Sequence, residues 1–332
     1  MTLATGVGSL PGTDPAEAAR LVVGELPDLP HLPELPGRGP AASMTGRALA
    51  VVAGVGSGLG ADLQPAGWRL TGGGEGLDQR RARSLLAQDL DMLEEVLEGY
   101  SGHLKVQVAG PWTLAATVER PRGDKVLADH GARRELAQAL AEGVRDHLAD
   151  VRRRVTGAGP LLLQVDEPAL GAVLAAKVPT ASGFGRHRAV DRPELSEHLA
   201  WVFAAAAESG AEPWAHSCAP GTPLDLLRGA GARGLSVDLD VLAPADHDAL
   251  GETLDGGDGV ALGIVPSVDP VTPPDDRALT DRVLGWLDGL GLDPAVVGPR
   301  LLITPSCGLA GATPAWARRA LTLCREVAKN LN

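Results

Sequence analysis

Short apolar runs alternate along the chain with longer stretches of helical periodicity. The run at residues 161–166, Leu-Leu-Leu-Gln-Val-Asp, is continuous and ends in a polar residue, as is typical of a strand buried on both faces of a parallel sheet. Runs of this kind predict strands at residues 5–9, 62–70, 104–109, 161–166, 213–216, 235–238, 260–265 and 301–304. Leucines and alanines at helical spacing predict helices at residues 78–100, 130–155, 192–209, 223–229, 274–287 and 314–331.

Eight strands, each followed by a crossover, predict an α/β fold of the single (β/α)8 TIM barrel type. We expect one domain over residues 1–332. An open, doubly wound sheet is the alternative. The glycine-rich stretch at residues 54–60 does not favour it, because it completes no G-x-G-x-x-G fingerprint after a clear strand.

The balance of charge restricts the partners that the chain can have. Its 332 residues carry a formal net charge of -12, which argues against nucleic acid or an anionic membrane as the main partner. No stretch approaches the ~20 apolar residues of a membrane span, and the first twelve residues have neither the basic region nor the apolar core of a signal peptide. We therefore expect a cytoplasmic protein that handles small molecules.

Residues whose side chains can bind metal or take part in catalysis lie at the carboxyl ends of several predicted strands, where the catalytic residues of a barrel lie. They are Asp166, Glu167, His216, Cys218, Asp238 and Cys307. His216 and Cys218 are two residues apart and point the same way if the strand continues. Cys307 would join them from a strand further round the barrel.

An imidazole and two thiolates are soft ligands that favour zinc, and three protein ligands with one open position are typical of a catalytic zinc site. Three cysteines in 332 residues do not form a disulfide framework. Cys324, in the last predicted helix, is interpreted as a small core residue. The long loops at residues 27–40 and 179–188 are either lids or plain connections.

Four motifs occur in the order known from one enzyme family. They are Val7-Gly8-Ser9-Leu10-Pro11, Gln164-Val165-Asp166-Glu167-Pro168-Ala169-Leu170, His216-Ser217-Cys218 and Pro305-Ser306-Cys307-Gly308-Leu309. With them the chain resembles, over nearly its whole length, the C-terminal catalytic domain of cobalamin-independent methionine synthase. The N-terminal half of the long enzymes of that family is expected to be absent.

The resemblance implies a set of site residues. His216, Cys218 and Cys307 would bind a zinc ion (Zn2+), and Asp238 would take the place of the family's glutamate as fourth ligand unless water does so. The carboxylate of homocysteine would lie on the loop of three residues that begins the first motif. These are Val7, Gly8 and Ser9.

Asp166 would bind the substrate ammonium group, and Glu167 beside it is also expected to contact substrate. As alternatives to binding, Asp166 could be a helix cap or form a salt bridge at the barrel rim, and Ser9 could be a turn residue.

The positions expected to contact the methyl donor depart from the family. The tryptophan that stacks on folate would fall near Thr117, although Trp112 is close by and is expected to contact substrate. The proton-donor histidine would fall at Val268 or Asp269, which makes Asp269 the predicted catalytic acid. An acidic substrate-binding residue early in the barrel has no clear match before Trp68.

We therefore expect a methyltransferase that moves a methyl group to a small thiol, homocysteine, to give methionine. The donor would be a methylfolate or a methylcorrinoid. A free thiol has a pKa of about 8.5 and zinc coordination deprotonates it. Two alternatives are a zinc-dependent thiol alkyltransferase with another thiol or donor, such as an epoxide, and a non-catalytic binding barrel.

Overall fold

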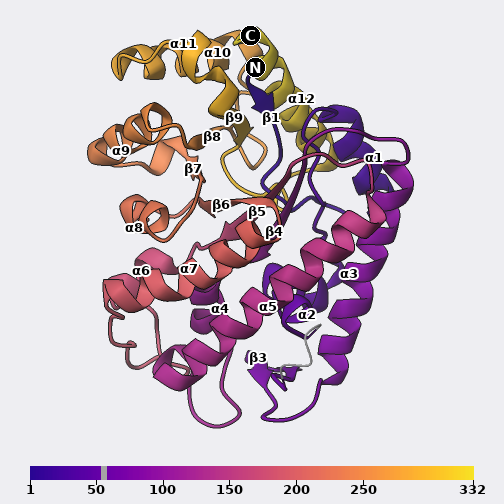
Figure 1. The fold of residues 1–332 in the computed structure, drawn as a ribbon, viewed down its shortest axis with the longest axis vertical. Helices are drawn as coiled ribbons and strands as arrows, with labels where there is room; N and C mark the ends of the chain where they lie inside the picture. Colours follow the sequence, from indigo (N-terminus) through magenta and orange to yellow (C-terminus); the bar gives the residue numbers. More distant parts are fainter. Residues whose placement is uncertain (54–57) are drawn as a thin grey trace.

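Seven parallel strands form a curled sheet in the computed structural model, which describes residues 1–53 and 58–332. Residues 54–57 of the glycine-rich stretch lie outside the described residues. The strand order is β1-β9-β8-β7-β6-β5-β4 (Figure 1). The strands are β1 (Leu3–Ala4), β4 (Leu104–Ala109), β5 (Leu161–Asp166), β6 (Ala211–Ser217), β7 (Gly234–Asp238), β8 (Gly259–Val265) and β9 (Leu301–Pro305).

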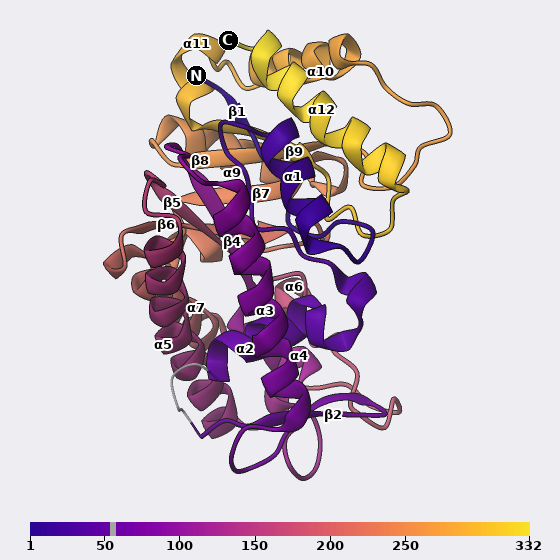
Figure 2. The ribbon, with the colours of Figure 1, turned by 90° about the vertical axis from the view of Figure 1, so that its right-hand side faces the viewer.

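Helices follow the strands and lie outside the curled sheet (Figure 2). They are α1 (Pro15–Glu25), α2 (Met44–Ala53), α3 (Leu77–Val96), α4 (Pro111–Thr117), α5 (His130–Arg154), α6 (Leu170–Leu174), α7 (Arg192–Glu208), α8 (Leu224–Gly229), α9 (Pro244–Asp255), α10 (Asp276–Gly289), α11 (Pro294–Val297) and α12 (Pro314–Asn330). Short 3-10 helices add η1 (Pro36–Arg38), η2 (Pro40–Ala42), η3 (Val126–Ala128), η4 (Leu239–Val241) and η5 (Gly298–Arg300).

Local chemistry sets where several helices begin. Asp14, Asp129, Asp191 and Thr313 precede α1, α5, α7 and α12, and each side chain accepts a hydrogen bond from a main-chain N–H of the first turn. Such caps satisfy donors that the helix itself leaves free. The two ends of the chain lie together, since Asn332 Nδ2 donates to Thr2 O at 3.0 Å.

The core lies between the sheet and its helices and is built mainly from leucine, valine and alanine side chains. Every residue of β4, β5 and β8 is buried, which confirms the reading of these runs as strands covered on both faces. No helix in the described ranges is long and apolar enough to cross a bilayer.

Most of the predicted strands match the structure closely. The runs at 104–109 and 161–166 coincide with β4 and β5, whereas β1 begins and ends earlier than the predicted 5–9. The predicted strand at 62–70 is wrong. That stretch is an antiparallel hairpin of β2 (Ala61–Gln64) and β3 (Gly67–Leu70), outside the main sheet, because Gly67, with a φ of 128°, turns the chain back.

Residues 30–34, in the predicted loop at 27–40, occupy the place expected for a second barrel strand. His31 pairs in parallel with Lys105 of β4, and Glu34 pairs in parallel with Ser9 after β1. Leu32 N donates to Lys105 O at 2.9 Å, and Leu10 N donates to Glu34 O at 2.9 Å. The segment thus contacts both edges of the seven-stranded sheet, but it forms isolated bridges, and a complete eight-stranded barrel is not confirmed.

Candidate active site

A cavity of about 280 Å3 opens at the carboxyl ends of the strands, where a barrel enzyme carries its active site. It brings together seven of the residues predicted from the sequence, and Glu34, Pro36, Met44, Pro168 and Gly308 complete its lining. The seven are Val7, Gly8, Ser9, Asp166, His216, Cys218 and Cys307. Sequence positions three hundred residues apart therefore share one small space.

His216, Cys218 and Cys307 form a cluster in this cavity. One ligand atom from each lies within 4.8 Å of the other two. His216 is in β6, Cys218 follows it, and Cys307 follows β9. The Cα atoms of the two cysteines are 5.9 Å apart, and the structure joins their sulfurs as a disulfide.

The cysteine pair alone does not explain the cluster. Zinc holds each sulfur ligand at about 2.3 Å, so a metal and a disulfide both need the two side chains aimed at one point. A disulfide uses only the cysteines, whereas a metal also uses the neighbouring imidazole. The three side chains can therefore hold a metal ion together.

The imidazole of His216 has the protonation and orientation of a metal ligand. Its side chain is buried, and Nδ1 lies 3.0 Å from Ser236 Oγ and 3.1 Å from Ser236 O. A carbonyl oxygen only accepts, so Nδ1 carries the hydrogen and Nε2 keeps its lone pair. Burial, and then the charge of Lys105, lower the pKa of His216 to about 3, so the ring is neutral at physiological pH.

Asp238, the predicted fourth ligand, is not one of the three clustered residues. It ends β7, next to β6 in the sheet, and its Oδ1 accepts a hydrogen bond from Asp240 N at 2.9 Å. Burial raises the pKa of its carboxyl above the usual range. Its role as a ligand stays a prediction.

Two carboxylates line the same cavity as the His216, Cys218 and Cys307 cluster. Asp166 ends β5, and its Oδ1 accepts from Gln164 Nε2 at 2.7 Å. Glu34 comes from the segment at residues 30–34, and its Oε1 accepts from Gln107 Nε2 at 3.0 Å. Burial, followed by the charge of Glu34, raises the pKa of Asp166 well above its ordinary value.

Glu34 is the site residue that the sequence analysis missed. The sequence pattern places no acidic residue early in the barrel, because Pro30 and Pro33 make residues 27–40 resemble a loop. The parallel pairing of residues 30–34 with β4 carries Glu34 to the cavity. The signal that could have found it is the leucine at every third position, Leu29, Leu32 and Leu35, all of which are buried.

Glu167 and Trp112, both predicted to contact substrate, do not line the cavity. The carboxylate of Glu167 is completely buried and accepts from Trp112 N at 2.9 Å, and from Thr113 N and Thr113 Oγ1 at 2.7 Å. The indole of Trp112 is stacked on His198, with ring centroids 4.9 Å apart, and donates to Leu195 O. Both side chains hold α4 in place, so the structure gives no support to a substrate contact.

Asp269, the predicted proton donor, is exposed and hydrogen-bonded to Thr313, the residue before α12. Its carboxylate accepts from Thr313 N at 2.8 Å and from Thr313 Oγ1 at 2.6 Å. These hydrogen bonds lower the pKa of Asp269 below its ordinary value. An ionised carboxylate outside the cavity is a poor proton donor, so its catalytic role has no structural support.

The loop at residues 179–188 is likewise separate from the cavity. His187 Nε2 lies 3.1 Å from Asp124 Oδ1, and Ala181 N donates to the same oxygen at 2.8 Å. The structure gives no support to the interpretation of this loop as a lid over the cavity, whereas Pro36 of the loop at residues 27–40 does line the cavity.

Comparison with known proteins connects this geometry to a family. The family described as "Cobalamin-independent synthase, Catalytic domain" matches residues 100–330. The chain belongs to this family. Its membership confirms the resemblance seen in the sequence and the predicted class of enzyme, a methyltransferase of the methionine synthase type. A comparison with curated protein sequences finds no match.

The chain was also compared with solved structures. A B12-independent methionine synthase from Shewanella sp. W3-18-1, in complex with selenomethionine, is similar with a TM-score of 0.65 and 14% identity, over 100% of this chain and 98% of that one. A 2,3-dimethylmalate lyase of the PEP mutase/isocitrate lyase superfamily gives a TM-score of 0.39 and 13% identity, over 95% of this chain and 78% of that one. The first likeness supports a barrel-type α/β fold.

Proposed function

We propose that this protein transfers a methyl group to the thiol of homocysteine and so forms methionine, using a zinc ion held by His216, Cys218 and Cys307. The observation that carries the proposal is the shared cavity. Two sulfurs and a neutral imidazole lie in the same small space as two carboxylates suited to an amino acid's ammonium group.

The three donors fit zinc on chemical grounds. Thiolate and imidazole ligands select it over the harder cations, and a site with three protein ligands keeps a position for substrate. The Ser236 contacts fix the ring of His216 with Nε2 available. Bound there, zinc would supply a deprotonated, nucleophilic substrate sulfur. Asp238 remains the proposed fourth ligand.

The chain's own groups can orient the amino-acid end of the substrate. Asp166 Oδ2 and Glu34 Oε2 accept no hydrogen bond from the described part of the chain and can receive an ammonium group. The main-chain N–H groups of Gly8 and Ser9 also have no acceptor among the described residues, beside Val7, whose carbonyl is already bonded. They are suited to the substrate carboxylate.

The methyl donor in this proposal is a methylfolate or a methylcorrinoid. The residues expected on the donor side do not gather in the cavity, because Trp112 of α4 is stacked on His198 of α7 and Asp269 is bound to Thr313. When a methylcorrinoid gives its methyl group to a thiolate, the demethylated corrinoid leaves with the electron pair of the carbon–cobalt bond and needs no proton. The folate nitrogen would need one, so this proposal favours a methylcorrinoid.

We also infer that residues 1–332 form one domain and that the segment at 30–34 closes the curled sheet into a (β/α)8 barrel. The support is its parallel pairing on one side with Lys105 and on the other with Ser9. Closure by this segment would place Glu34 between the first motif and β4.

An assay of methionine formation tests the proposed function. Zinc-loaded protein is incubated with homocysteine and either methylcobalamin or methyltetrahydrofolate, and methionine is quantified by mass spectrometry. We expect methionine with at least one donor, and a loss of at least about 100-fold in rate for Cys307→Ser, whose sulfur lies in the cluster. No methionine with either donor from protein shown to hold zinc and homocysteine would contradict methyl transfer.

A further inference from the structure

Lys105 is a charged residue inside the curled sheet. It lies in β4, and it is only 2% exposed. Removing an ammonium group from water is strongly unfavourable unless hydrogen bonds and nearby charges compensate for it. Burial lowers the pKa of Lys105 to about 8, so the group remains charged at neutral pH.

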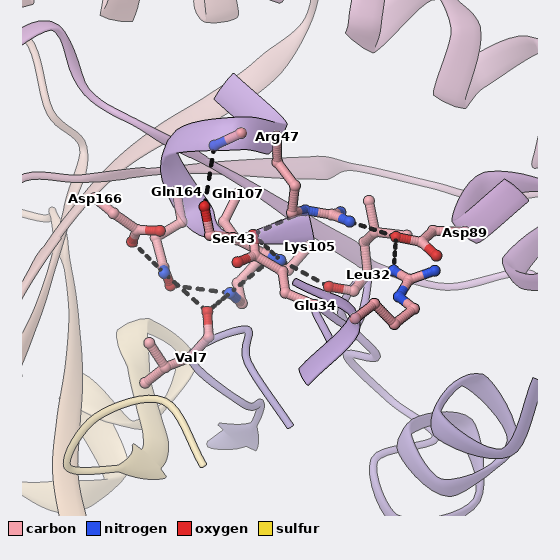
Figure 3. Close-up of polar contacts among 12 residues, drawn as sticks. Val7, Leu32, Glu34, Ser43, Arg47, Asp89, Lys105, Gln107, Gln164 and Asp166 are labelled. Atoms are coloured by element: carbon pink, nitrogen blue, oxygen red, sulfur yellow. Dashed lines mark hydrogen bonds and ion pairs between the residues drawn. The ribbon is translucent and has the colours of Figure 1, made fainter. Parts of the chain in front are cut away.

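The ammonium group of Lys105 donates to three uncharged oxygens. Val7 O and Gln164 Oε1 are each 2.9 Å from Nζ, and Gln107 Oε1 is 3.5 Å away (Figure 3). An ammonium group can only donate, so both glutamines must turn their amide oxygen toward it. Their NH2 groups therefore point to other acceptors, and the orientation of each amide is fixed.

The two NH2 groups reach the two carboxylates of the cavity. Gln164 Nε2 donates to Asp166 Oδ1 at 2.7 Å, and Gln107 Nε2 donates to Glu34 Oε1 at 3.0 Å. Figure 3 shows both relays starting from Lys105. Lys105 itself does not line the cavity. One buried cation thus orients two carboxylates that it does not touch.

An arginine on a helix also contacts Glu34. Arg47 of α2 has its Nε 3.3 Å from Glu34 Oε1 and forms an ion pair with Asp89 of α3. Asp89 also pairs with Arg38 at 2.7 Å. Gln107 and Arg47 contact the same oxygen of Glu34, Oε1. Gln164 donates to one oxygen of Asp166, Oδ1. The other oxygen of each carboxylate is left for a ligand.

We propose that Lys105 is a positioning residue for the substrate ammonium group. Through Gln164 and Gln107 it holds Asp166 and Glu34 in the orientation that binds this group, while the thiol end of the substrate is held elsewhere in the cavity. The inference rests on the proposed function, because it takes an amino-acid thiol as the ligand. It predicts that Lys105 controls affinity for the amino group and not for the thiol.

Calorimetric binding to the zinc-loaded full chain tests this division. The two probes are homocysteine and 4-mercaptobutanoate, which has the same thiol and carboxylate but no amino group. For Lys105→Met we expect the Kd of homocysteine to rise by about tenfold or more, since hydrogen bonds to charged groups are lost. The Kd of 4-mercaptobutanoate should change less than about threefold, and the zinc content should not change.

Gln164→Met provides a second variant if Lys105→Met fails to fold. It removes the relay to Asp166 and leaves the lysine in place, and the same selective loss for homocysteine is expected. Gln79→Met is the matched control. Gln79 is also completely buried and bonded to main-chain groups, Ala61 N and Leu49 O, but it does not line the cavity. It should leave both Kd values unchanged.

The possible results distinguish a failure of the positioning role of Lys105 from a failure of the proposed methyl transfer. An equal loss of affinity for both thiols, or no loss for homocysteine, in a folded, zinc-loaded variant would overturn the positioning role while methyl transfer still stands. Wild-type protein that holds zinc but binds neither thiol would overturn both the function and the inference.

Discussion

Ser236 fixes the ring of His216 through one nitrogen. The hydroxyl and the main-chain carbonyl of Ser236 are both within 3.1 Å of Nδ1. A partner on this nitrogen sets the tautomer of a metal-binding histidine and raises the basicity of the other nitrogen. Zinc affinity should therefore depend on a residue that is not a ligand.

Ser236→Ala should weaken zinc binding without abolishing it. The carbonyl of residue 236 can still accept the hydrogen of Nδ1, so we expect a loss of about tenfold, at the low end for such outer contacts. Competition with a chromogenic chelator measures the change. Thr253→Val, which removes a buried hydroxyl bonded to Ala249 O, is the control. Equal zinc affinity in Ser236→Ala and wild type would show that the hydroxyl does not support the ring.

Asp166 and Glu167 are adjacent at the end of β5 but have different roles. Consecutive side chains of a strand point to opposite sides, and a strand that runs into its loop largely keeps that alternation. Asp166 lines the cavity, whereas Glu167 turns away to bond with α4. The sequence motif contains both carboxylates, so the motif alone predicts that both contact substrate. In the structure only Asp166 of the two lines the cavity.

The carboxylate of Glu167 caps α4 from another element. Pro111 begins this helix, and Gly110 before it offers no side chain to accept from the first turn. Glu167 accepts from Trp112 N and Thr113 N instead. A Cβ at Gly110 would lie 2.3 Å from Glu167 Oε1, so glycine is needed for this close approach.

The cap predicts a particular dependence of stability on pH. Burial raises the pKa of Glu167 from 4.5 to about 7. Between these values the folded protein holds a proton that the unfolded chain has released, so the contribution of Glu167 to the free energy of unfolding falls as pH rises. It is largest below pH 4.5 and constant above about pH 7.

Glu167→Gln removes this titration because the amide is always neutral. The free energy of unfolding of wild type, minus that of the variant, should fall by on the order of 3 kcal/mol from pH 4.5 to pH 7. Urea unfolding at several pH values measures it. Glu142→Gln, at an exposed position, should give a nearly constant difference. A difference for Glu167→Gln that is independent of pH would contradict the account.

At the scale of the whole molecule, continuous apolar runs predicted the sheet well. Six of its seven strands, β4 to β9, were found because parallel strands covered on both faces leave a clear signal. Two elements were missed for opposite reasons. The hairpin of β2 and β3 has strand-like residues but pairs only with itself, whereas residues 30–34 contain prolines yet pair on both sides.

The cluster of His216, Cys218 and Cys307 could be predicted from sequence because its residues lie at or just after strand ends, and the strand ends of a parallel sheet converge. The buried polar residues that orient the two carboxylates of the cavity could not be predicted in this way. Lys105, Gln107 and Gln164 sit inside apolar runs, and only the register of β4 against β5 places their side chains together. Long-range pairings of this kind leave no local pattern.

The central claim is that His216, Cys218 and Cys307 bind one zinc ion, and elemental analysis tests it most directly. Protein purified under reducing conditions without chelator should contain about one zinc per chain, the stoichiometry of a single three-ligand site. Cys218→Ala and Cys307→Ser should lose the metal, whereas Cys324→Ala, in the buried face of α12, should keep it. Folded wild-type protein that takes up no zinc, or cysteine variants that retain it, would contradict the claim.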